Sequence, residues 1–380
     1  MALTEQMKTY LVESHEDAKS IVRELCKIPA PSHHELERAK WCENWLKNCG
    51  ARTVYIDDAY NVVCEHNVKK DNDVVVIMAH LDTVFPDLEP MPFVEKDGLY
   101  LSPGVTDDTG NLASLMIAFR YIIQNDVATK CGIVFVANSC EEGLGNLKGS
   151  RKIVDVYGNR IREFITVDGS KLERIVTGAV GSHRYKVTVK TEGGHSFSAF
   201  GNRNAIACLS SMISTLYSVK VPKDGDSITT YNVGIISGGT SVNTIAQDAS
   251  MLYEYRSTSK ACLLKMEEMF NKVLEAYRSM GITVESELIG NRPCTGDVDK
   301  TLHENLIAKA EESVRRVLGK ESNRAFSSTD ANTALAVGIP AICIGGAIGG
   351  NCHTREEWLD PESLLTGSSL ILDFLSHYFC

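Results

Sequence analysis

Residues 73–83 read DVVVIMAHLDT, in which an unbroken apolar run, 74–79, is followed by the polar side chains His80 and Asp82. A short run of this kind, rich in valine and isoleucine, is typical of a strand buried on both faces of a parallel sheet. Residues two apart in an extended chain point the same way, and open α/β sheets place their ligand sites at the carboxyl ends of strands. The stretch therefore predicts a buried strand with a candidate site at its end, although a hydrogen-bonded surface pair would have the same spacing.

The chain beyond this strand alternates between strand and helix patterns. Residues 132–137 form a second β-branched and aromatic run, residues 148–157 have helical spacing, and residues 164–167 form a third apolar run. Alternation of this kind is typical of a sheet that has helices on both of its faces. We therefore expect an α/β fold in which helices cover a mixed sheet.

A different pattern begins near residue 179. Residues 183–191 alternate polar and apolar side chains, and further strand patterns separate the helical patterns at 203–217 and 260–280. Polar alternation predicts strands that leave one face of a sheet open to solvent. We expect residues 179–289 to form a smaller inserted α+β domain, and residues 1–178 and 290–380 to form the α/β domain that it interrupts.

The composition argues against several classes of function. The chain has 49 acidic and 39 basic residues, a formal net charge of -10, whereas nucleic acids and anionic membranes bind basic surfaces. No segment approaches the ~20 apolar residues of a membrane span, and residues 1–20 lack the pattern of a signal peptide. The twelve cysteines are scattered, which favours reduced thiols over a disulfide framework. We expect a cytoplasmic protein with no nucleic-acid or membrane partner.

Two pairs of acidic residues lie at comparable places in the chain. One pair precedes a predicted helix, and the other follows a predicted strand, as His80 does. Asp107 and Asp108 lie in a glycine-bounded loop that leads into a helix, where they could equally cap that helix. Glu141 and Glu142 follow the apolar run at 132–137, and a solvated loop would explain them as well. Neither pair is specific by itself.

Asp168 and His353 complete the set. Asp168 follows the run at 164–167, and His353 follows a glycine-rich turn, although by itself it would suit a structural histidine. Three carboxylates and two imidazoles are what a pair of divalent ions needs when one carboxylate bridges them, and this ligand mixture suits zinc, cobalt or manganese. Two such ions could polarise a carbonyl while a nearby free carboxylate carries the proton.

Jointly, these motifs resemble peptidase family M20, the clan of co-catalytic zinc aminoacylases and carboxypeptidases. The resemblance covers essentially the whole chain, and the motifs occur in the family's order and approximate spacing: His80-Leu81-Asp82, Asp107-Asp108-Thr109-Gly110, Glu141-Glu142, Val167-Asp168-Gly169, Gly194-His195-Ser196, Ser241-Val242-Asn243, Arg256 and Cys352-His353-Thr354. It implies an α/β catalytic domain that is interrupted by a four-stranded lid, which usually forms a dimer interface.

The resemblance also implies how two ions are shared. His80 and Asp168 would hold one ion. Glu142 and His353 would hold the other, and Asp107 would bridge the two.

Two further residues receive roles from the resemblance. Glu141 would be the general base, and Asp82 would orient His80. The chain departs from the family at Thr109, where a lysine is common, and at Cys140, where an acid is common. Neither departure changes a ligand, so they bear on substrate preference more than on catalysis.

In the lid, the resemblance implies three residues that contact substrate. His195 would reach into the partner subunit's site to stabilise the developing oxyanion, and Arg256 would grip a substrate carboxylate. Asn243 would be a further substrate contact. A turn residue and a surface charge are the alternatives for Asn243 and Arg256.

The leading functional hypothesis is a homodimeric exopeptidase that cleaves di- or tripeptides. The sequence segments 141–145 and 328–332 look closest to those of the peptidase T-like branch of the family, which cleaves short peptides. A deacylase of N-acyl amino acids would keep every metal residue and differ only in its pocket. A metal-free dimeric binding protein is the third alternative, and retention of all five ligands with Glu141 argues against it.

Overall fold

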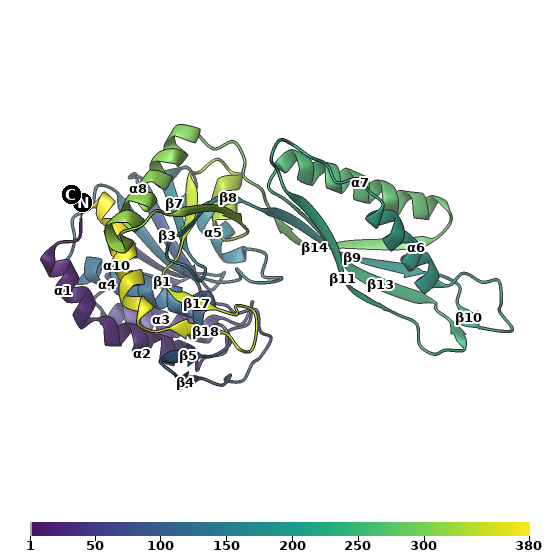
Figure 1. The fold of residues 1–380 in the computed structure, drawn as a ribbon, viewed down its shortest axis with the longest axis horizontal. Helices are drawn as coiled ribbons and strands as arrows, with labels where there is room; N and C mark the ends of the chain where they lie inside the picture. Colours follow the sequence, from purple (N-terminus) through teal and green to yellow (C-terminus); the bar gives the residue numbers. More distant parts are fainter. Residues whose placement is uncertain (1) are drawn as a thin grey trace. The chain divides into compact units, whose positions relative to one another are not determined.

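The computed structural model describes residues 2–380, which divide into two compact units (Figure 1). The first unit comprises residues up to 179 together with 296–380, and the second comprises residues 180–295. The second unit extends beyond the expected boundary at 289 because its last strand, β14 (Thr283–Arg292), continues past that residue.

The first unit is built on an eight-stranded sheet. In spatial order its strands are β1 (Thr53–Ile56), β2 (Val62–His66), β6 (Gly132–Asn138), β3 (Val74–His80), β7 (Ile161–Val167), β16 (Ala341–Ile344), β8 (Arg174–Ala179) and β15 (Asn323–Ser327). The central strands β6, β3, β7 and β16 run parallel, whereas β2 and β8 pair with their neighbours β6 and β16 in the antiparallel sense. The predicted mixed α/β sheet is confirmed.

The alternation of side chains along β3 explains why both faces of this sheet are covered. Val75 and Ile77 belong to one apolar core, and Val76 and Met78 belong to another, since successive residues of a strand point to opposite faces. The first core includes residues of α1 (Glu5–Glu13), α2 (His15–Leu25), α3 (Leu36–Asn48), α4 (Asn111–Gln124), α8 (Lys300–Leu318) and α10 (Ser363–Leu375). The second includes residues of α5 (Lys148–Tyr157) and α9 (Ala331–Ala336).

A smaller four-stranded sheet in the first unit contains the two strands that flank His353. Its order is β17 (Ile348–Gly350), β18 (Trp358–Asp360), β5 (Leu99–Leu101) and β4 (Val94–Lys96). His353 lies in the turn between β17 and β18, with a positive φ of 66°.

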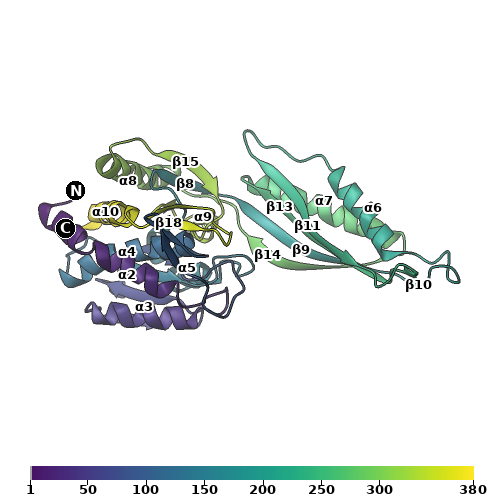
Figure 2. The same ribbon diagram turned by 60° about the horizontal axis from the view of Figure 1, so that its bottom comes forward.

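The second unit contains an antiparallel sheet with the order β11 (Thr229–Gly238), β13 (Asp248–Ser257), β9 (Gly181–Lys190) and β14. Two helices, α6 (Ala205–Tyr217) and α7 (Lys260–Ser279), lie on one face of it (Figure 2). Tyr185, Tyr253 and Tyr255 point to that face and share a core with both helices. The pair β10 (Gly194–His195) and β12 (Thr244–Ile245) forms a separate short ladder.

The described residues include no helix that is long and apolar enough to cross a membrane. All twelve cysteines are free thiols.

Candidate metal centre

Four parallel strands bring the predicted site residues to one edge of the main sheet. His80 is the last residue of β3 and lies opposite Asn138, the last residue of β6, while Val167 of β7 lies opposite Ile344 of β16. Because parallel strands end at the same edge, the residues that follow them meet there. Glu141 and Asp168 follow β6 and β7 in this way, whereas His353 reaches the site from the turn between β17 and β18.

Asp107 lies at the middle of the cluster. Its Oδ1 is 3.0 Å from Nε2 of His80, and its Oδ2 is 3.1 Å from Nε2 of His353. The same nitrogen of His353 lies 3.1 Å from Oε1 of Glu142. Each oxygen of this carboxylate therefore faces a different imidazole, as a bridging ligand requires.

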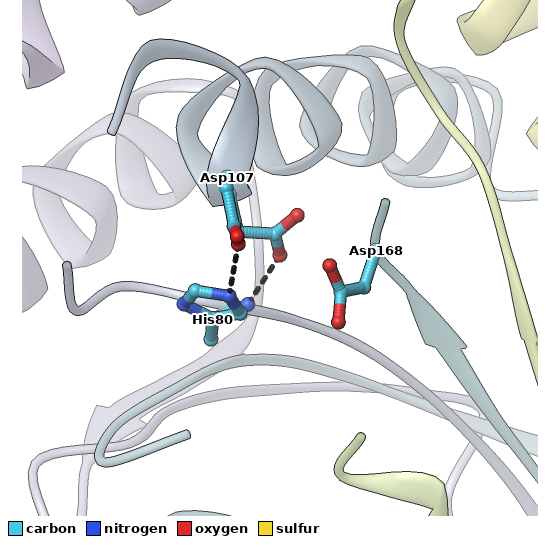
Figure 3. A group of neighbouring side chains, drawn as sticks. His80, Asp107 and Asp168 are labelled. Carbon is cyan, nitrogen blue, oxygen red and sulfur yellow. Dashed lines mark hydrogen bonds and ion pairs between the residues drawn. The ribbon is translucent and has the colours of Figure 1, made fainter. Parts of the chain in front are cut away.

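Asp168 faces the same space from the neighbouring strand. Figure 3 shows its carboxylate pointing toward His80 and Asp107. One ligand atom from each of His80, Asp107, Asp108 and Asp168 lies within 4.8 Å of the others. Asp107, Glu142 and His353 form a second group by the same criterion. The two groups share Asp107.

The segment that carries Asp107, η1 (Val105–Gly110), is kinked, since Asp107 and Asp108 have non-helical backbone angles, and it runs directly into α4. The peptide bond between Asp107 and Asp108 is cis. Asp108 is fully buried, and its Oδ2 accepts the main-chain N–H of His80 at 2.7 Å. This bond ties the loop to the end of β3.

The Glu141–Glu142 turn is held by Asp82. Oδ1 of Asp82 accepts the amide of Glu141 at 2.9 Å, and Oδ2 accepts the amide of Glu142 at 2.9 Å. Nδ1 of His80 is 2.9 Å from the main-chain oxygen of Asp82 and 3.5 Å from its carboxylate. Asp82 thus contacts His80 chiefly through its backbone, while its carboxylate orders the two glutamates.

The charges of the cluster favour bound cations. Burial would lower the pKa of His80, but the carboxylates of Asp108, Asp107 and Asp82 raise it well above its usual value. Hydrogen bonds with Asp107 and Glu142 raise the pKa of His353 to about 11. In the metal-free protein, protonated imidazoles therefore supply the positive charge that the carboxylates attract.

Burial raises the pKa of the acids, whereas it would lower the pKa of a histidine. Burial and the nearby charge of Asp107 raise the pKa of Asp168 to about 7. Burial also raises the pKa of Asp108 well above its usual value. A cation would reverse these shifts, because it stabilises the ionised carboxylates.

Glu357 is a site residue that the sequence patterns did not indicate. Its carboxylate accepts the amides of Gly104, Thr106 and Asp107 at 2.8 to 2.9 Å, and it is fully buried. Burial raises the pKa of Glu357 to about 7. The acidic pair Glu356-Glu357, shortly after His353, was the available signal, but an acidic pair in a loop is common on protein surfaces.

The three residues expected to contact substrate from the lid all lie in the second unit. His195 is in β10, and its Nδ1 accepts weak bonds from the amides of Phe197 and Ser198 at 3.3 and 3.4 Å. The carbonyl of Asn243 accepts the amide of Ser196 at 2.9 Å, which brings Asn243 beside His195. Arg256 lies on β13 instead.

Arg256 is engaged by a carboxylate of its own strand. Its Nε and one terminal nitrogen lie 3.0 and 3.1 Å from the two oxygens of Glu254. This two-pronged pairing is the geometry in which a guanidinium recognises a carboxylate.

A helix-covered mixed sheet that gathers carboxylates and imidazoles at its strand ends is typical of metal-dependent hydrolases. The model of peptidase family M20/M25/M40 matches residues 76–377, and the chain belongs to this family. The predicted family is confirmed, and the protein is a hydrolase with side chains that could bind metal ions.

Similar proteins include hydrolases of more than one kind. A succinyl-diaminopimelate desuccinylase of Corynebacterium glutamicum is 25% identical over 364 residues, which cover 94% of this chain and 95% of that protein. Two solved structures share the fold over nearly the whole chain. Aminopeptidase PepT from Bacillus cereus has a TM-score of 0.70 at 23% identity and covers 95% of this chain and 97% of its own. A tripeptidase from Staphylococcus aureus has a TM-score of 0.75 at 22% identity, covering 96% and 98%.

Proposed function

We propose that this enzyme uses two divalent metal ions to hydrolyse the amide bond of short peptides, as a di- or tripeptide exopeptidase. The observation that supports this most directly is the carboxylate of Asp107, whose oxygens face His80 at 3.0 Å and His353 at 3.1 Å. A single carboxylate placed between two sets of ligands is the arrangement that two-metal hydrolases use.

The donor atoms fit two such ions. We assign His80 and Asp168 to one ion, Glu142 and His353 to the other, and Asp107 to both. Each set mixes imidazole nitrogen with carboxylate oxygen, which suits zinc and also cobalt or manganese. The raised pKa of His353, to about 11, supports this assignment, because Asp107 and Glu142 favour positive charge at this position.

When bound, the ions would polarise the scissile carbonyl and make a water molecule more acidic. We assign the proton transfer to Glu141. Its backbone is fixed by the bond from its amide to Oδ1 of Asp82, and one of its oxygens lies within 4.8 Å of ligand atoms of His80 and Glu142. A carboxylate in this position can take a proton from the attacking water and deliver it to the leaving amine.

We assign substrate binding to the second unit. Arg256 would hold the substrate's carboxylate, His195 would stabilise the developing oxyanion in the site of a partner subunit, and Asn243 would add a hydrogen bond. The assignment of Arg256 rests on the family resemblance, and a substrate carboxylate would have to displace Glu254, which holds the guanidinium in this structure. These roles make the enzyme a homodimer, and its free thiols agree with a cytoplasmic location.

A second candidate is the removal of an acyl group from an N-acyl amino acid. The desuccinylase relative favours it, whereas PepT and the tripeptidase favour peptides. Both reactions break an amide bond and would use the same ligands.

One experiment separates the two reactions. Purified protein saturated with zinc, and separately with cobalt or manganese, is incubated with matched dipeptides, tripeptides and N-acyl amino acids, and the products are identified by mass. We expect release of free amino acids from di- or tripeptides. Cleavage of the N-acyl compounds alone would support the deacylase, and no cleavage of any substrate would contradict both.

A further inference from the structure

The segment formed by residues 30–38 lies outside the region that matches the family, yet it contacts the ends of both β3 and β6. Its main chain pairs with Thr83, just beyond Asp82: the carbonyl of Ala30 accepts the amide of Thr83 at 2.9 Å, and Pro31 forms a parallel bridge with Thr83. We call residues 30–38 the N-terminal brace. We propose that Ser32 and Glu35 of this brace are positioning residues that fix the orientation of Glu141.

Ser32 acts on the carboxylate that already holds the two glutamates. Its hydroxyl lies 2.6 Å from Oδ2 of Asp82 and 3.2 Å from the carbonyl of Glu142. A hydroxyl has a single proton, and the shorter, charge-assisted bond to Asp82 is the stronger of the two. Oδ2 of Asp82 also accepts the amide of Glu142, so Ser32 restrains the atom on which the turn depends.

Glu35 holds the residue that precedes Glu141. One of its oxygens accepts the amide of Cys140 at 3.0 Å and the amide of His33 at 2.9 Å. Cys140 has a φ of 59°, which a residue with a side chain adopts only when its surroundings hold it there. Glu35 therefore accepts a hydrogen bond from the residue at which the chain turns toward Glu141.

The burial of Glu35 is energetically costly. Its exposed fraction is 0%, and its second oxygen has no hydrogen-bond partner among the described residues. Burying a carboxylate is unfavourable unless its bonds compensate for lost water. The bonds that compensate come from the amide of His33 within the brace and from the amide and thiol of Cys140 in the turn before Glu141.

Arg38 makes the brace rigid. Its guanidinium is 2% exposed and donates to the carbonyls of Leu25, Ile28 and Leu81 at 2.8 to 3.1 Å. Leu81 separates His80 from Asp82, so this side chain fastens α3 to the same strand end. A support that orients a proton carrier must itself be fixed, because displacement of a reacting group by about 1 Å can cost ~100-fold in rate.

The inference rests on the proposed role of Glu141, and two measurements keep the two ideas separable. The first is hydrogen exchange of the metal-free, full-length protein. Glu35→Ala removes the acceptor of the Cys140 and His33 amides, so exchange at residue 33 and in residues 139–143 should accelerate by at least about tenfold, while exchange elsewhere is unchanged. Glu37→Gln is the control, since Glu37 lies on the exposed side of α3 and pairs with Lys40 at the surface.

The second measurement is the kinetics of the zinc-loaded enzyme on a substrate that the wild type cleaves. We expect Glu35→Ala and Ser32→Ala to lower kcat by at least about tenfold while KM and the number of bound ions stay unchanged. Glu35→Gln keeps an accepting oxygen and should recover most of the rate. Glu37→Gln should match the wild type in both measurements.

Particular results would overturn the inference. Unchanged exchange at residues 139–143 in Glu35→Ala would show that Glu35 does not hold the turn. Wild-type kcat in both Glu35→Ala and Ser32→Ala, or a loss of kcat that follows only from lost metal, would show that the brace does not orient Glu141. If Glu35→Ala does not fold, Ser32→Ala decides, because it removes one partly buried hydroxyl. A wild-type enzyme that cleaves no substrate would contradict the proposed function and leave the exchange result valid.

Discussion

Asp82 and Glu141 are joined by a hydrogen bond of 2.9 Å, from the main-chain amide of Glu141 to Oδ1 of Asp82. The other oxygen of Asp82 accepts the amide of Glu142 at the same distance. One buried carboxylate at the end of β3 therefore sets the positions of two glutamates that follow β6. Its effect on catalysis follows from that geometry.

We predict that Asp82→Asn lowers kcat by about 10- to 100-fold while both metal ions remain bound. The amide group has one accepting oxygen, so its NH₂ group would face one of the two backbone N–H donors. Steady-state kinetics with elemental analysis measure the effect, and Asp126→Asn, at an exposed ion pair with Arg52, is the control. Full activity in Asp82→Asn would show that the order of the turn does not limit the rate.

Metal binding should reveal the sharing of Asp107. We expect about two divalent ions per chain in the wild type, because two groups of ligand atoms meet at this residue. Asp107→Ala should weaken both sites, whereas His353→Ala should weaken only one. Elemental analysis of metal-saturated protein, followed by titration with a chelator, distinguishes these results. A wild-type value of one ion or none would refute the two-metal assignment.

The two neighbouring glutamates should behave differently. Glu141→Gln cannot carry a proton, so kcat should fall by about 10²- to 10⁴-fold with KM and metal content retained. Glu142→Gln should instead lose affinity for one ion, and added metal should restore part of its rate. If Glu141→Gln lost metal and regained full turnover on metal addition, the two roles would have to be exchanged.

The metal-free protein should lose stability as the pH rises. His353 has a pKa raised from 6.5 to about 11 by its bonds with Asp107 and Glu142, so its protonated form stabilises the folded state. This contribution is complete below pH 6.5 and disappears as the pH approaches about 11. The effect is weakened by solvent, since the side chain is 55% exposed.

Thermal unfolding across that pH range measures the contribution. We expect Tm of the metal-free protein to fall with pH, and His353→Gln to remove part of the slope. Metal-loaded protein should lack the part of the slope that comes from His353, because an imidazole that binds a metal ion is neutral. An identical slope in the wild type and in His353→Gln would exclude His353 as its source.

A mixed dimer tests the proposed role of His195. His195→Ala and Glu141→Ala should each be nearly inactive, and a mixture should recover part of the activity when subunits exchange. Recovery follows because one site of the mixed dimer would receive an intact Glu141 from one chain and an intact His195 from the other. Light scattering establishes the oligomeric state, and an active monomer would contradict the prediction.

Local patterns were sufficient to predict the main features of the first unit. The apolar run before His80 became β3, and the run at 132–137 became most of β6, because unbroken apolar stretches are stable only where both faces are covered. The meeting of Glu141 and Asp168 beside His80 could also be predicted, since parallel strands end at one edge of a sheet.

What the sequence by itself determined was the central strands β3, β6 and β7, their shared edge and the candidate metal-binding residues near it. Only the tertiary structure decided which groups hold those residues in place. Glu357 reaches the amide of Asp107 across 250 positions, and Glu35 reaches Cys140 across 105. The carboxylate of Asp82 accepts hydrogen bonds from the amides of Glu141 and Glu142, whereas its main-chain carbonyl lies within hydrogen-bond distance of His80. Hydrogen-bond partners of buried carboxylates are selected by packing between distant segments, and the periodicity of a single segment carries no information about them.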